Sequence, residues 1–264
     1  MTVGNRKPGD FCWINILTPQ PDDARAFFAK VLGWTYTDMP GMGHRVFVNG
    51  KNIGGIFDLN ALTTPPGTPP VIGVMVKVRS ADAAAERVAS LGGKAMQAFD
   101  VADAGRMAVC FDPNGANIDV WEPKASHGID ADSTHHGAPS WFETATTDVA
   151  RASAFYSALF GWTTEQLEMP GLTYTTFKLD DAPVAGIWPI TPEMGSVQPS
   201  WSTYFTVNDV DAAAGQAVKL GGSISVPAQD IPNVGRFCGL VSPQGVMFYT
   251  ITYSELGSDS NLAS

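Results

Sequence analysis

Cysteine and basic residues are both scarce in this chain of 264 residues. The three cysteines, Cys12, Cys110 and Cys238, are odd in number, widely spaced and set among apolar residues. That pattern is not a disulfide framework, so we expect buried free thiols. Only 16 residues are Lys or Arg against 26 Asp or Glu, which gives a net charge of -10. Because binding to a phosphate backbone relies on clustered Lys and Arg, we expect no nucleic-acid partner.

The sequence also has no long apolar run. No stretch reaches the roughly 18 apolar residues that a membrane span needs, and residues 1–10 lack the apolar segment of a signal peptide. We therefore expect no membrane association and a cytoplasmic location. A Gly-rich phosphate loop, a G-x-S-x-G elbow and a C-x-x-C pair are absent too, so nothing favours a nucleotide-binding, hydrolase or thiol-redox protein.

What the chain does contain is one long internal repeat. Residues 27–34, FFAKVLGW, return 128 residues later as FYSALFGW, and Trp13 returns as Trp141. Solenoid units are only about 20 to 50 residues long, so this repeat indicates a duplicated whole domain. We predict the following division of the chain: a first domain over residues 1–122, a linker over 123–138, a second domain over 139–254 and a polar tail over 255–264.

Each half shows the order strand, helix, strand, strand, strand twice. The first helix has an apolar face, because apolar residues recur at i, i+3, i+4, i+7 and i+8, namely Ala24, Phe27, Phe28, Val31 and Leu32. Gly33 ends this helix. The later helices are expected over residues 80–91, 148–160 and 209–220, and the last strands of the first half over 94–97, 106–112 and 116–121. Four βαβββ units result, which is an α+β fold.

Three features together resemble a known family. They are the paired βαβββ units, the helix that ends in Phe-Phe/Tyr-x-x-x-Leu/Phe-Gly-Trp, and the Asp/Ser-Pro-x-Gly turns at residues 112–115 and 242–245. The chain resembles the vicinal oxygen chelate superfamily, also called the glyoxalase, bleomycin-resistance and extradiol dioxygenase superfamily. The resemblance implies that the four units pair into two tandem glyoxalase-like cup domains. It also implies that enzymatic members bind a divalent metal through His or Glu on strands lining the cup.

The metal-ligand positions of the family can be carried over one by one. They fall on Trp13, near Gly73 and on Asp119 in the first half, and on Trp141, near Ser202 and on Tyr249 in the second. Only Asp119 is a plausible ligand, and a catalytic metal ordinarily takes about three protein ligands. We therefore predict no metal and no other cofactor. A divalent metal remains the alternative if the true ligands lie at other positions.

The candidate site residues are the polar and aromatic side chains expected to face the two cups. They are Trp13, Asn15 and Asp119 in the first cup, and Trp141, Glu143, Ser202, Tyr204 and Tyr249 in the second. Glu143 is the candidate catalytic residue, because burial beside Trp141 would raise the pKa of its carboxyl toward the range of a general base. The alternative is that Glu143 pairs with Arg236 or with a backbone donor.

One arginine begins a strand in each half, and two interpretations of this pair are possible. Arg106 is expected to form a structural ion pair with Asp100 or Asp103, and Arg236 with Asp230. The alternative is that these arginines bind an anionic substrate, because Arg forms bidentate contacts with carboxylates.

The sequence predicts a protein that binds a small organic molecule, aromatic or carbonyl-bearing, in a metal-free cup. The role implied by the resemblance is detoxification, drug sequestration or metabolite sensing. Three alternatives stay open: a metal-dependent glyoxalase- or dioxygenase-type enzyme, a metal-free acid-base enzyme that uses Glu143, and a structural protein with vestigial cups. We expect the second cup to be the better ligand site, because it combines three hydroxyls and a carboxylate with Trp141. The oligomeric state is left open.

Overall fold

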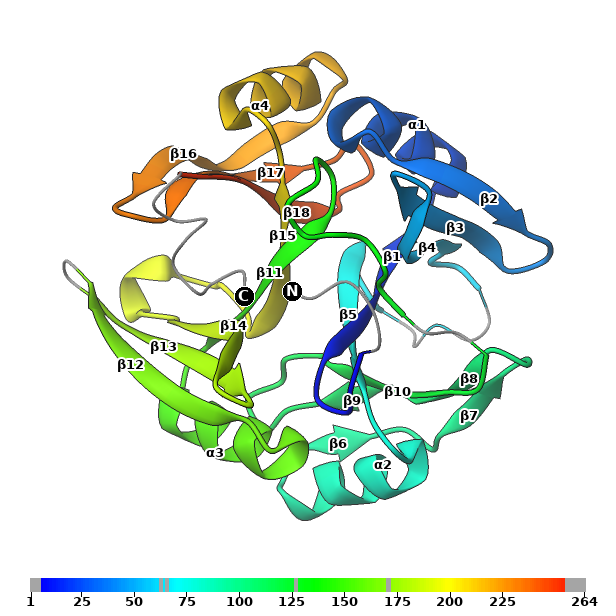
Figure 1. The fold of residues 1–264 in the computed structure, drawn as a ribbon, viewed down its shortest axis with the longest axis vertical. Coiled ribbons are helices and arrows are strands. Elements are labelled where there is room, and N and C mark those ends of the chain that lie inside the picture. The colour runs from blue at the N-terminus through cyan, green and yellow to red at the C-terminus, as the bar shows by residue number, and fades with distance from the viewer. Residues whose placement is uncertain (1–5, 62–63, 65–66, 126–127, 170–171, 255–264) are drawn as a thin grey trace.

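The chain folds into two eight-stranded sheets, one from each half (Figure 1). The computed structural model describes residues 6–61, 64, 67–125, 128–169 and 172–254, so the predicted tail lies outside the described residues. In the first half the elements are β1 (Phe11–Thr18), α1 (Pro21–Leu32), β2 (Thr35–Met39), β3 (Gly43–Val48), β4 (Lys51–Asp58), β5 (Val71–Lys77), α2 (Ala81–Ser90), β6 (Lys94–Ala95), β7 (Phe99–Val101), β8 (Gly105–Ala108), β9 (Cys110–Phe111) and β10 (Asp119–Pro123).

The second half repeats this order with two continuous strands, β16 and β17, in place of β6–β7 and β8–β9, and with an added 3-10 helix. Its elements are β11 (Pro139–Thr146), α3 (Val149–Phe160), β12 (Thr163–Met169), β13 (Leu172–Leu179), β14 (Ala182–Pro189), the 3-10 helix η1 (Pro192–Met194), β15 (Ser200–Thr206), α4 (Val210–Lys219), β16 (Ser223–Ile231), β17 (Gly235–Val241) and β18 (Met247–Tyr253). The strand orders are β2-β3-β4-β1-β5-β10-β8-β7 and β12-β13-β14-β11-β15-β18-β17-β16. Antiparallel pairs β1–β5 and β11–β15 join the two units of each sheet at its centre.

The predicted α+β fold of four βαβββ units in two tandem cups is confirmed. The helix ends also agree with the sequence: Gly33 and its repeat partner Gly161 take left-handed φ angles of 66° and 75°, which glycine adopts without strain. One detail differs. The predicted strand over 106–112 is split between β8 and β9, and β9 pairs with β6 in a separate two-stranded ladder.

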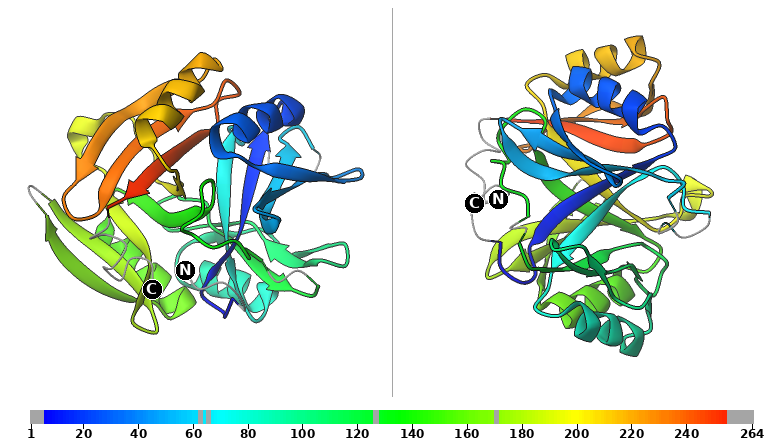
Figure 2. Two further views of the ribbon diagram at one scale, coloured as in Figure 1. Left: turned by 45° about the horizontal axis from the view of Figure 1, so that its top comes forward. Right: turned by 90° about the vertical axis from the view of Figure 1, so that its right-hand side faces the viewer.

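The two sheets share one core. The helices lie on the face of each sheet that is turned toward the other half, where α1 packs near α4 and α2 near α3 (Figures 1 and 2). The rings of Phe11 and Phe142 stack at this junction with centroids 4.0 Å apart. Trp34 and its repeat partner Trp162 donate indole hydrogen bonds to the carbonyls of Gly137 and Gly9, at 2.7 and 2.9 Å. A single buried apolar cluster therefore spans both halves.

The interdomain segment is packed rather than loose, because Ile129 and Ala131 are fully or almost fully buried in the shared core. The three cysteines are buried free thiols, as predicted. Among the described residues, no helix is long and apolar enough to cross a membrane.

Candidate functional site

The outward face of each sheet carries a row of three side chains on neighbouring central strands. In the first cup Trp13 of β1 pairs with Met75 of β5, and Met75 pairs with Asp119 of β10. In the second cup the corresponding row is Trp141 of β11, Tyr204 of β15 and Tyr249 of β18. Side chains along a strand alternate between faces, so residues two positions away share the same face. The structure thus brings together most of the predicted site residues within each cup.

The first cup is largely apolar with two hydrogen-bonded polar pairs. Trp13 Nε1 donates to Asn15 Oδ1 at 2.7 Å, and Asn117 Nδ2 donates to Asp119 Oδ1 at 2.9 Å. Asp119 is buried, and burial raises the pKa of its carboxyl to about 7, against the opposing effect of the Asn117 hydrogen bond. The surrounding cluster is built on Cys12, Met75, Met107 and Trp121.

The second cup is organised around Glu143. Tyr174 donates its hydroxyl to Glu143 Oε2 at 2.7 Å, and Tyr204 donates to Glu143 Oε1 at 3.0 Å. Trp141 Nε1 donates in turn to the Tyr174 hydroxyl at 3.0 Å. Burial raises the pKa of Glu143, while the two tyrosine hydrogen bonds act in the opposite direction. The alternative pairing of Glu143 with Arg236 or a backbone donor is wrong, because tyrosine hydroxyls donate to both carboxylate oxygens and Arg236 pairs with Asp211 and Asp230.

Tyr174 is the site residue that the sequence analysis missed. It lies on β13, two strands away from Glu143 on β11, and reaches it across β14. A Cβ atom on Gly186 of β14 would lie 1.7 Å from the Tyr174 hydroxyl oxygen, so only glycine leaves room for this side chain. A glycine inside a strand is a known sign of close approach, and Gly186 was the signal that could have pointed to a bulky neighbour.

Aromatic and apolar side chains surround the Glu143 cluster. The rings of Tyr204 and Tyr249 stack with centroids 4.6 Å apart at an interplanar angle of 18°. Ser202 lies directly across from Glu143 in the β11–β15 ladder. Further out on the same face, by strand alternation, Trp188 of β14 is 37% exposed and Met247 of β18 is 43% exposed. The lining thus combines an acidic centre with exposed apolar surface.

The two strand-opening arginines form structural ion pairs. Arg106 contacts Asp82 at 2.7 Å and Asp100 at 3.5 Å, so among its predicted partners Asp100 is used rather than Asp103. Arg236 contacts Asp230 at 3.2 Å, as predicted. It also contacts Asp211 in the first turn of α4 at 2.8 Å. Asp82, the partner of Arg106, likewise lies in the first turn of its helix, α2. Each arginine therefore joins a helix to a strand by an ion pair, α2 to β8 in the first domain and α4 to β17 in the second.

The residues present do not fit a divalent metal centre of the family type. Among the residues that the structure describes, no group of three or more His, Cys, Asp and Glu side chains could hold a metal ion. The row of the first cup offers one carboxylate, at Asp119, beside an indole and a thioether. The row of the second cup offers an indole and two phenols. Catalytic metals ordinarily take about three His, Cys, Asp or Glu ligands from the protein, and neither row supplies them. A metal-free site therefore remains our prediction.

Comparison with known proteins identifies the superfamily to which this chain belongs. Residues 11–120 and 139–249 both match the model of the Glyoxalase/Bleomycin resistance protein/Dioxygenase superfamily. The chain belongs to this superfamily. A Mycobacterium tuberculosis protein provisionally named glyoxylase CFP32 is 35% identical over 89% of this chain and 92% of that protein. The anthracycline biosynthesis protein DnrV of Streptomyces peucetius is 31% identical over 94% of each chain.

Solved structures show the same fold at low sequence identity. The Mn(II)-bound glyoxalase from Novosphingobium aromaticivorans has a TM-score of 0.66 at 16% identity and covers 98% of this chain and 86% of its own. A catechol 2,3-dioxygenase has a TM-score of 0.62 at 14% identity, over 94% of this chain and 89% of that one. At these identities the likeness concerns the fold alone.

Proposed function

We propose that the second cup binds a small aromatic or carbonyl-bearing molecule without a metal centre. The observation that carries this proposal is the Glu143 carboxyl held between the hydroxyls of Tyr174 and Tyr204, beside the indole of Trp141. Small-molecule sites are typically apolar and aromatic with a few convergent polar groups, and this lining has that composition.

The polar groups suit an oxygen-bearing planar ligand. Tyr174 and Tyr204 each donate their one O–H to Glu143, so a ligand carbonyl oxygen would accept from the Tyr249 hydroxyl or from Glu143 in its protonated form, which the raised pKa favours. The ring of Tyr249, which is stacked on the buried Tyr204, and the partly exposed Trp188 offer flat apolar surface for an aromatic ring. In the first cup the row beside Trp13 has a thioether at Met75 and a single carboxyl at Asp119, which gives fewer groups to orient a ligand.

The relatives support a role in the handling of small organic molecules. The name of CFP32 calls it a glyoxylase, and the name of DnrV places it in anthracycline biosynthesis. We propose detoxification, sequestration or sensing of such a molecule as the role of this chain, in the cytoplasm, with the small molecule as its partner.

An acid-base enzyme is the second candidate function. A carboxyl with a raised pKa within hydrogen-bond distance of two phenols is suited to proton transfer. In this mechanism the Glu143 carboxylate takes a proton from the carbon next to a ligand carbonyl, and the Tyr249 hydroxyl donates a hydrogen bond to the oxygen on which negative charge develops. Loss of turnover with retained ligand affinity in Glu143→Gln would favour the enzyme over the binding protein.

The proposal is tested by titrating a panel of small aromatic and carbonyl compounds into the protein by calorimetry. Ligands are expected whose affinity falls at least about tenfold, or 1.4 kcal/mol, in Glu143→Ala and Trp141→Ala. The matched substitutions in the first cup, Asn15→Ala and Trp13→Ala, should leave their affinity unchanged. Ligands that respond only to Trp13 and Asp119 substitutions would place the site in the first cup instead.

Metal analysis separates the proposal from the metal-dependent alternative. We expect no stoichiometric zinc, iron, nickel or manganese in the isolated protein. About one such ion per domain, lost in Asp119→Ala, would contradict the metal-free cup.

A further inference from the structure

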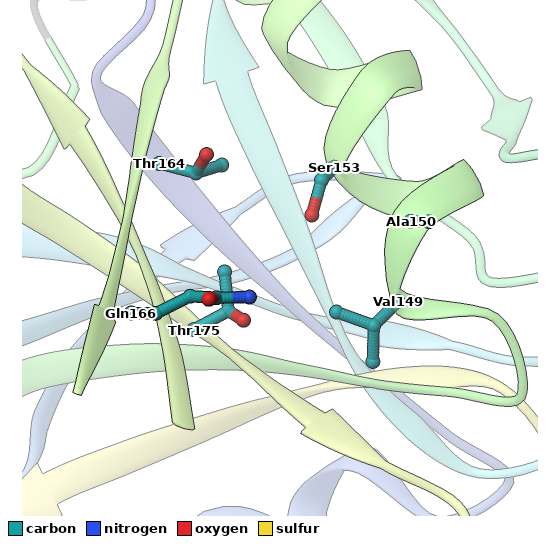
Figure 3. Close-up of a pocket in the computed structure, with 6 residues that line it drawn as sticks. All are labelled: Val149, Ala150, Ser153, Thr164, Gln166 and Thr175. Atoms are coloured by element: carbon teal, nitrogen blue, oxygen red, sulfur yellow. The ribbon is translucent and has the colours of Figure 1, made fainter. Parts of the chain in front are cut away.

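A groove lies on the helix-bearing side of the second sheet, opposite the cup. It has a volume of about 610 Å³ and runs between α3 and the strands β12 and β13. Figure 3 shows Val149 and Ser153 on the helix facing Thr164 and Gln166 on the strand. The described residues that line the groove are Val149, Ala150, Ser153, Thr164, Gln166 and Thr175. All six are uncharged, and the groove is open to solvent along one side.

The repeat provides a direct comparison with the same place in the first domain. The positions that match Ala150, Ser153, Thr164, Gln166 and Thr175 are Asp22, Arg25, Tyr36, Asp38 and His44. The strand registers confirm this match. Asp38 pairs with His44 in β2–β3 just as Gln166 pairs with Thr175 in β12–β13.

In the first domain, large and charged side chains fill this space. The guanidinium of Arg25 lies over the ring of Tyr36, 5.5 Å from its centroid, and contacts Asp22 at 3.1 Å. Arg25 Nη1 also lies 3.1 Å from the imidazole of His44, whose Nδ1 is 2.9 Å from Asp38. Three flat groups therefore occupy the space between α1 and the β2–β3 hairpin, and the exposed carboxylates of Asp22 and Asp38 lie against them.

The second domain has lost all three flat groups and both carboxylates. Ala150 and Ser153 stand where Asp22 and Arg25 stand in the first domain, so the groove is open. Its lining offers the hydroxyls of Ser153, Thr164 and Thr175 and the amide of Gln166, which both donate and accept hydrogen bonds. A charged ligand would find no ionic partner among the residues that line the groove.

We propose that this groove is a second binding site, for a flat, neutral molecule of the aromatic amide class. The ring occupies the space that the stacked Arg25 and Tyr36 side chains fill in the first domain. The amide exchanges hydrogen bonds with the hydroxyl and amide groups of the lining. The site is independent of the cup, because the groove and the Glu143 cluster lie on opposite faces of the second sheet.

Benzamide, benzoate and benzamidine test the proposal, because they are nearly the same in shape and differ in charge. Binding to the full chain is followed by NMR, with amide resonances assigned along α3, β12 and β13. Benzamide is expected to bind with a Kd in the millimolar range, about −4 kcal/mol, and to shift the resonances of Ser153, Thr164 and Thr175. We expect at least about tenfold weaker binding of benzoate and benzamidine at these residues. Equal binding of all three, or shifts confined to the second cup, would overturn the proposal.

Two variants make the test sharper. Restoring the carboxylates of the first domain with Ala150→Asp/Gln166→Asp should reverse the preference in favour of benzamidine, because the cation then gains ionic partners. Refilling the groove with Ser153→Arg/Thr164→Tyr should abolish the benzamide shifts. Both variants alter exposed or half-buried positions, so their thermal unfolding should stay close to that of the parent chain. Retained benzamide binding in the refilled variant would also overturn the proposal.

Discussion

At the scale of single residues, the duplication has given matched positions different chemistry. Asn15 in one cup corresponds to Glu143 in the other, and Asp119 corresponds to Tyr249. The acidic group has therefore moved from the last strand of one cup to the first strand of the other. In both cups, burial raises the pKa of this carboxyl. The pH dependence of stability follows from these two groups.

Asp119→Asn is expected to stabilise the protein at pH 8 by about 1–3 kcal/mol and to have a smaller effect near pH 5. The pKa of Asp119 is about 7 in the folded chain, whereas an unperturbed Asp carboxyl, as in the unfolded chain, has a pKa of 3.8. Folding therefore favours the protonated carboxyl. Its contribution to stability is present below pH 3.8 and is lost as the pH rises through 7. Asparagine removes the buried charge and can still accept from Asn117. Urea unfolding at both pH values measures the difference, and an equal effect at both would contradict this account.

Gly186→Ala is expected to destabilise the fold by about 1–3 kcal/mol, because its methyl group would collide with the Tyr174 hydroxyl. The displaced tyrosine would lose its hydrogen bonds to Glu143 and Trp141. The control is Gly215→Ala in α4, where an added methyl meets nothing within 4 Å. This change should stabilise by up to about 1 kcal/mol through helix propensity. Thermal unfolding compares the two variants, and a neutral Gly186→Ala would refute the close approach.

At the scale of elements, three of the four long helices in the described part of the chain have a side-chain N-cap. Ser80, Asp148 and Asp209 accept hydrogen bonds from backbone N–H groups in the first turns of α2, α3 and α4. Before α1 the cap residue is Gln20, which makes no such bond. The duplicated helices α1 and α3 thus differ at the cap, which lies close to the groove of the second domain.

Asp148→Ala is expected to lower the free energy of unfolding by about 1 kcal/mol, because the Arg151 N–H loses its acceptor at 2.9 Å. Asp148→Asn keeps a capping oxygen and should cost much less. In the other direction, Gln20→Asp should stabilise α1 by a few tenths to about 1 kcal/mol. Denaturant unfolding distinguishes these outcomes. Equal stability of the alanine and asparagine variants would show that the cap contributes little.

At the scale of the whole molecule, the two domains are joined by a shared core. Phe142 stacks on Phe11 across the junction, and Tyr156 of α3 donates a 2.9 Å hydrogen bond to Asp112 in the turn before β10. The linker contributes buried side chains of its own, such as Ile129. We therefore expect the domains to unfold together.

Phe142→Ala is expected to destabilise the whole chain by about 3 kcal/mol and to leave a single unfolding transition. The removed ring leaves a cavity between the sheets that neither domain can close alone. Differential scanning calorimetry measures both the midpoint and the number of transitions. Val218→Ala, at an exposed position on α4, serves as the control and should shift stability by less than about 0.5 kcal/mol. Two separate transitions in the parent chain would contradict a shared core.

The sequence by itself determined the duplication, the βαβββ fold class and most of the residues that face each cup. These features are encoded locally: the helical spacing of Phe27, Phe28 and Val31 marks an apolar face, and strand alternation places Trp141 and Glu143 on one side. The tertiary structure alone decided the hydrogen-bond partners of Glu143, because Tyr174 reaches it across a strand only where Gly186 leaves space. It also decided that the halves share a core and that one groove is open while its counterpart is filled. Those features depend on contacts between residues far apart in the chain, which periodicity along a single segment does not record.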